Sequence, residues 1–143
     1  MNLNLILKKG FSDIKFGLTT KAVESILGKP NLTFNDDDDN IIWLYNELKL
    51  RLTFYADEDF RMGYIICSHL NVKIFEDNIL EKPIEEVINN MKKKGLSTWE
   101  TEQFDSTFNY FNEDNWLVLQ TEFGLVNKVE LGVVQKNLDE FNW

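Results

Sequence analysis

A short stretch near the N-terminus has apolar residues at helical spacing and a marker at each end. Val23, Ile26 and Leu27 are three and four positions apart, so that they form one stripe on a helix. Thr19 precedes the stretch and is a residue type that caps helix N-termini. Gly28 follows it and suits the left-handed position that ends many helices. The pattern predicts a helix of two to three turns that needs tertiary packing to persist.

A second stretch repeats this pattern in the other half of the chain. Its apolar residues are Ile84, Val87, Ile88 and Met91, again at three- and four-residue spacing. Pro83 is expected in the first helical turn, where its missing N–H costs nothing, and the residues at 92–94 are three lysines that suit the negative end of a helix dipole. We therefore predict a second helix that ends before residue 95.

Runs with the alternation of β-strands follow each helix. The middle run of the first half, 48–55, places leucines and Phe54 on one face and Arg51 and Tyr55 on the other. In 60–68, Met62, Tyr64 and Ile66 are expected to share a face. In 116–123, Leu117 and Phe123 are expected on one face, with Trp116, Gln120 and Glu122 on the other. The predicted strands are 41–47, 48–55, 60–68, 107–112, 116–123 and 125–134, and a short strand or helix at 3–7 and a strand or connector at 72–75 stay open.

The two halves match each other in order and spacing. Phe16 is matched by Leu80 and Val23 by Val87, each 64 positions later, and Leu52 is matched by Leu119. Tandem copies of one unit explain this best, because each half alone is too short to bury a sufficient core. We predict one α+β domain over 1–143, with repeats of about 1–70 and 71–143. Each repeat is a helix followed by an antiparallel β-meander, and the strands join in one sheet with both helices on one face.

The residues from Phe16 to Asn31, FGLTTKAVESILGKPN, also resemble a known family. They are similar to the opening of SmpA/OmlA (BamE-like) outer-membrane assembly lipoproteins, where a Thr-Val-Leu-Gly-Pro pattern precedes a β-meander. The tandem arrangement is similar to the beta-lactamase inhibitor protein, which has two helix-plus-sheet repeats and a concave binding face. Domains of this general look also occur among bacterial toxin-immunity proteins. The resemblance implies a binding face on the sheet.

Charge and composition narrow the function classes. The net charge of −9 disfavours nucleic acid and anionic membrane surfaces and favours a basic protein partner. Cys67 is the only cysteine and lies in an apolar run, so a buried, inert thiol is expected. The apolar residues at 3–7 come before the lysines at 8 and 9, the reverse of a signal peptide. We expect a cytoplasmic protein.

No catalytic, cofactor-binding or metal-binding motif stands out. The acidic run at 36–39 imitates the spacing of an EF-hand loop, with Glu47 at its twelfth position, but Ile41 replaces the required glycine. His69 is the only histidine and is expected at the exposed end of a strand, where a structural role is favoured. We therefore expect no catalysis, no cofactor and no metal, and a solvated acidic loop.

The functional hypothesis is a non-enzymatic binding protein, most concretely an immunity protein that neutralises a basic toxin. Acidic loops would speed the encounter, and aromatic side chains on the sheet would provide the anchors. A scaffold or small-ligand or peptide module, and a homo-oligomer, stay open as alternatives. The expected partner-binding residues are Asp36, Asp37, Asp38, Asp39, Arg51, Tyr55, Asp57, Glu58, Asp59, Trp116, Gln120 and Glu122.

Overall fold

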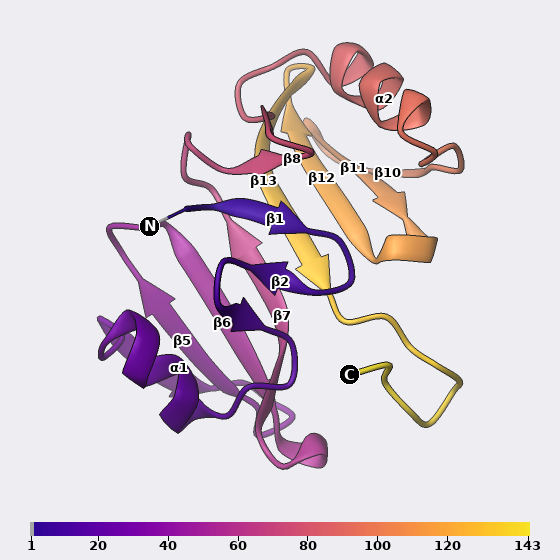
Figure 1. The fold of residues 1–143 in the computed structure, drawn as a ribbon. Coiled ribbons are helices and arrows are strands. Elements are labelled where there is room, and N and C mark those ends of the chain that lie inside the picture. The colour runs from indigo at the N-terminus through magenta and orange to yellow at the C-terminus, as the bar shows by residue number, and fades with distance from the viewer. Residues whose placement is uncertain (1) are drawn as a thin grey trace.

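The computed structural model describes residues 2–143 and has an α+β fold with two helices and two sheets, which confirms the predicted fold class (Figure 1). None of the helices in residues 2–143 has the length and apolar character that crossing a bilayer requires. The elements are β1 (Asn4–Ile6), β2 (Gly10–Phe11), β3 (Ile14–Lys15), α1 (Thr20–Leu27), β4 (Leu32–Asn35), β5 (Ile41–Tyr45), β6 (Leu50–Tyr55), the 3-10 helix η1 (Ala56–Glu58), β7 (Arg61–Cys67), β8 (Lys73–Ile74), β9 (Asp77–Asn78), α2 (Ile84–Lys93), β10 (Glu100–Phe104), β11 (Thr107–Asn112), the 3-10 helix η2 (Glu113–Asn115), β12 (Leu117–Glu122) and β13 (Leu125–Gly132).

The larger sheet has eight antiparallel strands in the order β10-β11-β12-β13-β7-β6-β5-β4. Each half of the chain contributes four consecutive strands, and the last strands of the two halves, β7 and β13, pair in the centre. Two of its strands, β4 and β10, were not predicted. Both are short edge strands of four and five residues whose residues are all exposed, so their patterns are weaker than the longer half-buried alternation by which the other strands were found.

A second sheet corrects the prediction of a single sheet. Its five short strands have the order β3-β2-β1-β8-β9, with β1 parallel to β8 and the other pairs antiparallel. The two segments left open, 3–7 and 72–75, both contribute strands to it. Strands of two or three residues are too short to show a period, and one of the turns that join them needs a positive φ at Ser12. The hydrophobic pattern of the chain is therefore only a weak signal for this sheet.

The two helices lie close to their predicted positions. Thr19 caps α1, since its hydroxyl accepts a hydrogen bond from the Ala22 N–H at 3.3 Å. Gly28 ends the helix with a positive φ of 79°, but its ψ of −175° lies outside the left-handed helical region that was predicted. Only Val23 of the predicted stripe is fully buried, whereas Ile26 faces solvent because so short a helix packs along one narrow line. Pro83 is the residue before α2 and not part of its first turn.

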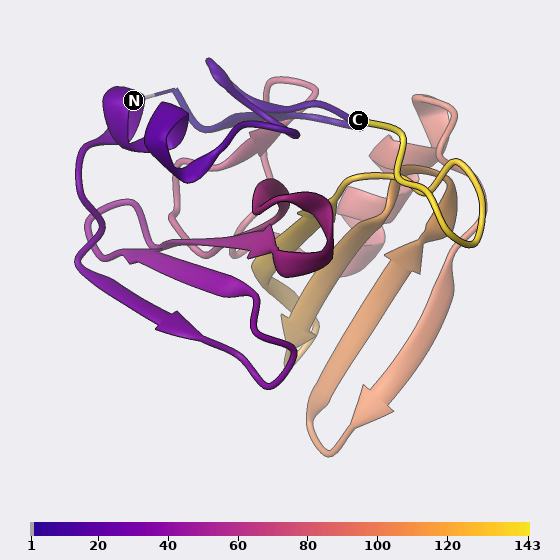
Figure 2. The same ribbon diagram turned by 90° about the horizontal axis from the view of Figure 1, so that it is seen from below.

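One hydrophobic core joins the two helices, the small sheet and one face of the large sheet. Val23 of α1 and Val87 of α2 belong to it, as do Trp43 and Tyr45, whose face the sequence left open. The buried Cys67 thiol also lies here, and burial raises its pKa, as expected for an inert thiol. Figure 2 shows the small sheet above the large one, and no helix or strand of residues 2–143 covers the opposite face of the large sheet.

A β-bulge changes which residues of β7 reach that open face. The register between β6 and β7 shifts between Thr53 and Phe54, so one extra residue lies on the β7 side. Met62 therefore points into the core, whereas Tyr64 lies on the open face, against the prediction that the two share a face. The prediction for Phe123 is also wrong, because this residue has a positive φ in the β12–β13 turn and is 87% exposed.

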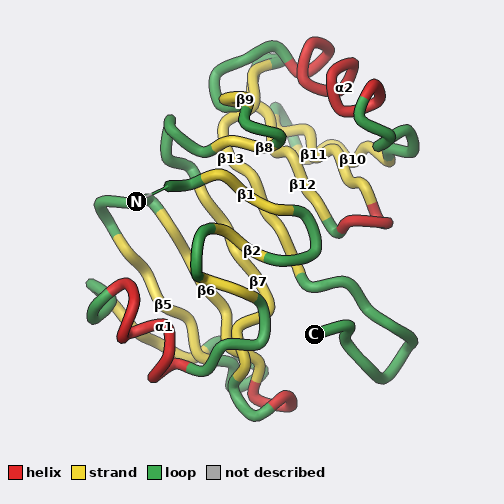
Figure 3. The backbone as a smooth tube through the Cα atoms, in the orientation of Figure 1, coloured by secondary structure: helices red, strands yellow, loops and turns green. Residues whose placement is uncertain are grey.

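The C-terminal segment after β13 runs as a loop back to the end of the large sheet (Figure 3). Phe141 stacks on Tyr55 with ring centroids 5.3 Å apart. The Trp143 indole N–H donates a hydrogen bond to the Glu58 carboxylate at 3.2 Å, and the Arg61 guanidinium lies 4.6 Å from the Trp143 ring centroid. The segment therefore packs against the body of the protein. The sequence alone did not decide whether it would do so.

Candidate functional site

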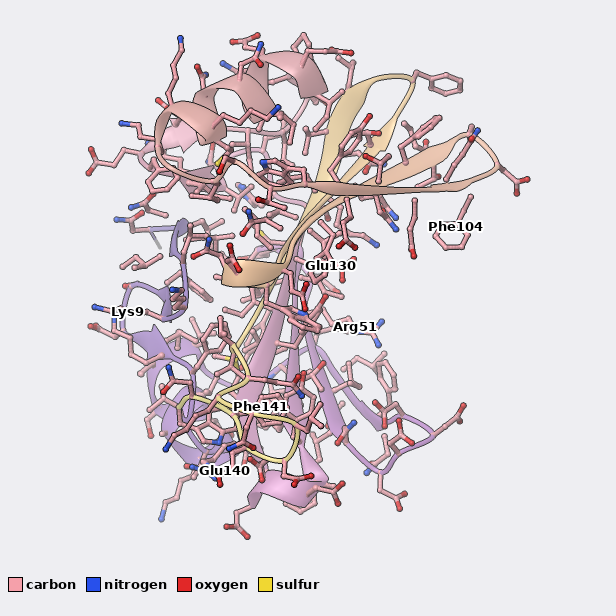
Figure 4. The ribbon with its side chains drawn as sticks, turned by 90° about the vertical axis from the view of Figure 1, so that its right-hand side faces the viewer. Lys9, Arg51, Phe104, Glu130, Glu140 and Phe141 are labelled. Atoms are coloured by element: carbon pink, nitrogen blue, oxygen red, sulfur yellow. The ribbon has the colours of Figure 1, made fainter. Side chains whose placement is uncertain are left out.

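The open face of the large sheet is the candidate site, and the strand register defines its side chains. One row of neighbours crosses all eight strands at its centre, and residues two positions away on each strand share the same face. Figure 4 shows Arg51 and Glu130 in the middle of this face, with Phe104 on an arm that projects beyond them. The central row consists of Glu100, Phe111, Val118, Glu130, Ile66, Arg51, Leu44 and Leu32.

The face is hollow. Ile42 lies on it, paired with Phe34 and Thr53, yet it is fully buried although it is not part of the main core. Its neighbours on the same face therefore cover it, and Figure 2 shows the strands of the two halves of the sheet at an angle to each other. Three pockets open along the hollow, and each has a different chemical character.

The first pocket is acidic and has a volume of about 320 Å³. Glu100 and Glu102 of β10 and Glu130 of β13 contribute three carboxylates, and Phe111 and Asn109 complete most of its lining. The Oδ1 atom of Asn109 is buried and has no hydrogen-bond partner among residues 2–143. A buried acceptor without a donor costs free energy, so a ligand that donates hydrogen bonds would be stabilised here. We call this the acidic pocket.

A cationic region lies beside it in the centre of the face. Arg51 and Lys128 line a second pocket of about 390 Å³, together with Ile66 and Leu44. The Arg51 guanidinium lies 5.7 Å from the ring centroid of Phe34, and its buried Nε has no hydrogen-bond partner within the described chain. The centre of the hollow can therefore bind a ligand group that accepts a hydrogen bond from Arg51, while the carboxylates on the β10 side favour a cation.

The third pocket is aromatic and has a volume of about 310 Å³. Its rings are Tyr55, Tyr64, Trp116 and Phe141, and we call it the aromatic pocket. The Tyr64 hydroxyl donates a hydrogen bond to the Glu130 carboxylate at 2.6 Å, which connects this pocket to the acidic one. Burial raises the pKa of Tyr64, and the neighbouring Glu130 carboxylate adds to the shift, so the phenol stays protonated.

The predicted acidic loops lie outside the hollow. The run 36–39 forms the β4–β5 hairpin loop, where the Asp36 carboxylate accepts hydrogen bonds from the backbone N–H of Asp38 at 2.9 Å and of Asn40 at 3.0 Å. Burial opposes the charged form of Asp36, but the hydrogen bonds from Asn40 and Asp38 and the positive charge of Arg51 outweigh it, so its pKa is lowered. Asp36 therefore holds the loop together, and Asp37 is free to face solvent.

The remaining predicted residues divide between the hollow and the turns. Arg51, Tyr55, Trp116 and Gln120 lie on the open face or at its pockets, and Glu122 lies at its margin, where its carboxylate accepts a hydrogen bond from Thr107 at 3.3 Å. Asp57 and Glu58 lie in η1, and Asp59 follows it. Among them, the Glu58 carboxylate is engaged by Trp143 and Arg61.

Sequence reasoning missed the residues that give the hollow its character. Glu100, Glu102 and Glu130 were not proposed, and neither were Tyr64 and Phe111. The alternation in 100–104, with Glu100, Glu102 and Phe104 on one face, was a signal for an edge strand with an acidic face. Within residues 2–143, no group of three or more His, Cys, Asp or Glu side chains is arranged to hold a metal ion.

Comparisons with known proteins identify the fold but no family. No protein-family model matches the chain, and no curated protein matches it. Solved structures are similar at low identity. An extracellular protein containing a SCP domain from Bacillus anthracis has a TM-score of 0.55 at 17% identity, over 86% of this chain and 47% of that one. A DUF4309 family protein, YjgB, from Bacillus subtilis has a TM-score of 0.53 at 14% identity, over 87% of both chains.

A third similar structure is a cysteine-rich secretory protein from Staphylococcus aureus, with a TM-score of 0.54 at 13% identity, over 90% of this chain and 48% of that one. The chain therefore spans about half the length of two of its structural neighbours. These structures correct two predictions. The fold resembles the DUF4309 protein and about half of each of the two larger proteins, instead of SmpA/OmlA domains or the beta-lactamase inhibitor protein. The prediction of a cytoplasmic protein is contradicted, because two neighbours are described as extracellular and secretory.

Proposed function

We propose that this chain is a non-enzymatic binding domain that holds a basic protein partner in the hollow of its large sheet. The observation that carries the proposal is the acidic pocket on the open face, where Glu100, Glu102 and Glu130 gather in about 320 Å³. A lysine or arginine side chain of a partner would complement this charge and would supply the donor that the buried Asn109 oxygen lacks.

Exposed apolar side chains at both ends of the hollow support a protein partner. Leu32 and Phe34 project from β4 at one edge, and Phe104 projects from β10 at the other. Leu32 is 53% exposed and Phe104 is 59% exposed. Protein interfaces draw most of their affinity from a few such anchors, because apolar and aromatic side chains lose water on contact. A partner that enters the hollow would cover both sets of anchors.

The charge of the whole chain supports the same kind of partner. A net charge of −9 attracts a basic protein over distance, and the exposed carboxylates of the β4–β5 loop and of η1 would raise the rate of encounter. Glu58 is not assigned this role, because its carboxylate is engaged by Trp143 and Arg61. The narrower role of a toxin-immunity protein stays a hypothesis, because the three similar structures support a fold and no function.

We further propose that the two halves of the chain are tandem copies of one unit. The strand order supports this interpretation, because each half contributes four consecutive strands and their last strands, β7 and β13, pair antiparallel at the centre. Two copies joined in this way double the width of the sheet. The hollow then lies across the junction, with Ile66 of β7 beside Glu130 of β13.

The experiment is affinity capture with the purified chain as bait, from both lysate and culture medium of the native host, at low and at high salt. The matched bait is Glu100→Gln/Glu102→Gln, and the control is Glu76→Gln/Glu81→Gln, which removes two exposed carboxylates away from the open face. We expect one basic protein that the chain and the control retain and that the sheet variant and high salt release. Equal capture by all three baits would contradict the proposal, and so would recovery of the chain itself alone.

A further inference from the structure

The aromatic pocket is built by two glycines whose missing side chains leave room for rings. A Cβ atom on Gly132 would lie 2.5 Å from Trp116 Cδ1 and 2.9 Å from Tyr64 Cδ1. A Cβ atom on Gly63 would lie 2.3 Å from Tyr55 Cε2. Neither glycine has a positive φ, so the backbone conformation does not require glycine at either position. Glycine is needed because the rings lie against the backbone of β7 and β13, and a strand glycine of this kind marks a close approach.

Space remains between these rings. The pocket volume of about 310 Å³ is at the lower end of the range for ligand sites, roughly 300–1,000 Å³. Gly132 and Val133 contribute the rest of its buried lining, and Gln135 lies at its exposed rim. The four rings come from separate parts of the chain, namely the end of β6, β7, the residue after η2 and the C-terminal segment. The pocket fits a compact group and not an extended one.

The chemistry of the pocket favours a cation. Three other aromatic rings of this protein already have a cationic side chain over them, namely Phe34 with Arg51, Trp143 with Arg61 and Phe75 with Lys94. No lysine or arginine lines the aromatic pocket, and within residues 2–143 none lies over its four rings. Phe141 covers one face of Tyr55, so the ring surface available to an external cation is the part that lines the pocket, and no internal cation occupies it in the described chain.

A fixed negative charge lies next to these rings. The Glu130 carboxylate accepts the Tyr64 hydroxyl hydrogen bond at 2.6 Å, so its position is set by a ring of the pocket. A neutral apolar ligand would gain nothing from this carboxylate, whereas a cation would gain both from it and from the ring faces. A cation without N–H donors suits the site best, because the lining is mostly ring and aliphatic surface.

We propose that the aromatic pocket binds a compact alkylated ammonium group. Quaternary ammonium ions are the ligands for which pockets of several aromatic rings are suited, since they are large, positively charged and cannot donate hydrogen bonds to water or protein. The site is distinct from the acidic pocket, where an ammonium or guanidinium with N–H groups is the better match. Its test uses the free chain without any partner, so its outcome does not depend on the proposed protein-binding function.

The test is a titration of the full chain with choline and with its neutral carbon isostere, 3,3-dimethylbutan-1-ol, followed through the tryptophan indole signals in the NMR spectrum. We expect a saturable shift of the Trp116 signal with choline and at least about tenfold weaker binding of the isostere. Equal or tighter binding of the isostere would overturn the proposal and assign the pocket to neutral apolar groups. A shift that does not saturate with either compound would also overturn it.

Three variants keep the test specific. Glu130→Gln removes the charge but keeps an oxygen that accepts the Tyr64 hydrogen bond, so it should weaken choline and leave the isostere unchanged. Trp116→Leu removes a ring and should weaken choline at least about tenfold. Trp99→Leu is the control, because Trp99 lies beside α2 and away from the pocket. If Trp116→Leu fails to fold, Glu130→Gln still tests the proposal. Unchanged choline binding by Glu130→Gln would contradict the proposed role of the carboxylate charge.

Discussion

At the scale of single residues, burial changes the chemistry of side chains on both faces of the large sheet. The tyrosines give the clearest case. Burial, with the charge of Asp36 as a smaller contribution, raises the pKa of Tyr55 to about 12. Burial and then the charge of Glu24 raise the pKa of Tyr45 to about 12, and the pKa of Tyr64 is raised as well. Each of these phenols therefore holds its proton more tightly in the folded chain than in the unfolded one, where the value is near 10.

These pKa values predict a loss of stability in alkali. Between about pH 10 and pH 12 the unfolded chain releases phenolic protons that the folded chain retains, so the free energy of unfolding falls as pH rises. Urea denaturation at a series of pH values measures this fall, and tyrosinate absorbance of the native chain gives the titration itself. Tyr55→Phe should make the fall shallower. A flat stability profile above pH 10, or native tyrosines that titrate like free ones, would contradict these assignments.

The position of a residue was predictable from the sequence when it depends only on neighbouring residues in the chain. The cap at Thr19 and the turn at Gly28 depend on neighbours in the chain and were found. Arg51 and Gln120 were placed on the open face by alternation alone. Met62 was wrongly grouped with Tyr64 and Ile66, because the bulge between β6 and β7 depends on the pairing of two strands and leaves no mark in a single-strand period.

At the scale of elements, the C-terminal segment is held to the large sheet by a few defined contacts. Trp143 packs near Gly17 and Gly63, stacks with Arg61 and donates a hydrogen bond to Glu58. Phe141 packs between Trp143 and Tyr55. Since Phe141 also lines the aromatic pocket, the segment and the pocket depend on each other.

Removing the Trp143 side chain should therefore destabilise the fold. Trp143→Ala loses a partly buried indole, a cation–π contact and a hydrogen bond to a carboxylate, for a total of roughly 1–3 kcal/mol in the free energy of unfolding. The control is Leu138→Ala in the same segment, where the side chain is 94% exposed and a change within about 0.5 kcal/mol is expected. Urea denaturation measures both. Equal effects of the two substitutions would mean that the segment does not dock as described.

Elements were predictable where they are long and half-buried. The six central strands of the large sheet and both helices have clear periods, and all eight were found. The other strands were missed or left open. The edge strands β4 and β10 have only exposed residues, and the strands of the small sheet have only two or three residues each. A sheet of such strands is stabilised by tertiary packing, which a single sequence does not reveal.

At the scale of the whole molecule, the arrangement of layers explains why one face is free. Both helices and the small sheet pack on the same side of the eight-stranded sheet and form one core with it. The other side has the three pockets and the exposed anchors at both edges. It also has buried polar atoms of Arg51 and Asn109 that find no hydrogen-bond partner within residues 2–143. We propose that this face binds a basic partner. The binding surface depends on how strands from both halves of the chain are arranged, and no single sequence motif contains it.

The most direct test is the affinity of the captured partner for three proteins, namely the chain, Glu100→Gln/Glu102→Gln and Glu76→Gln/Glu81→Gln. The two double variants lose the same charge, so they differ only in where the charge was. The account predicts that the sheet variant binds about tenfold more weakly, or by about 1.4 kcal/mol, while the control binds like the chain. Equal weakening in both variants would mean that only the net charge of the chain matters, which contradicts a site on the open face. Unchanged binding by the sheet variant would mean that the interface lies elsewhere.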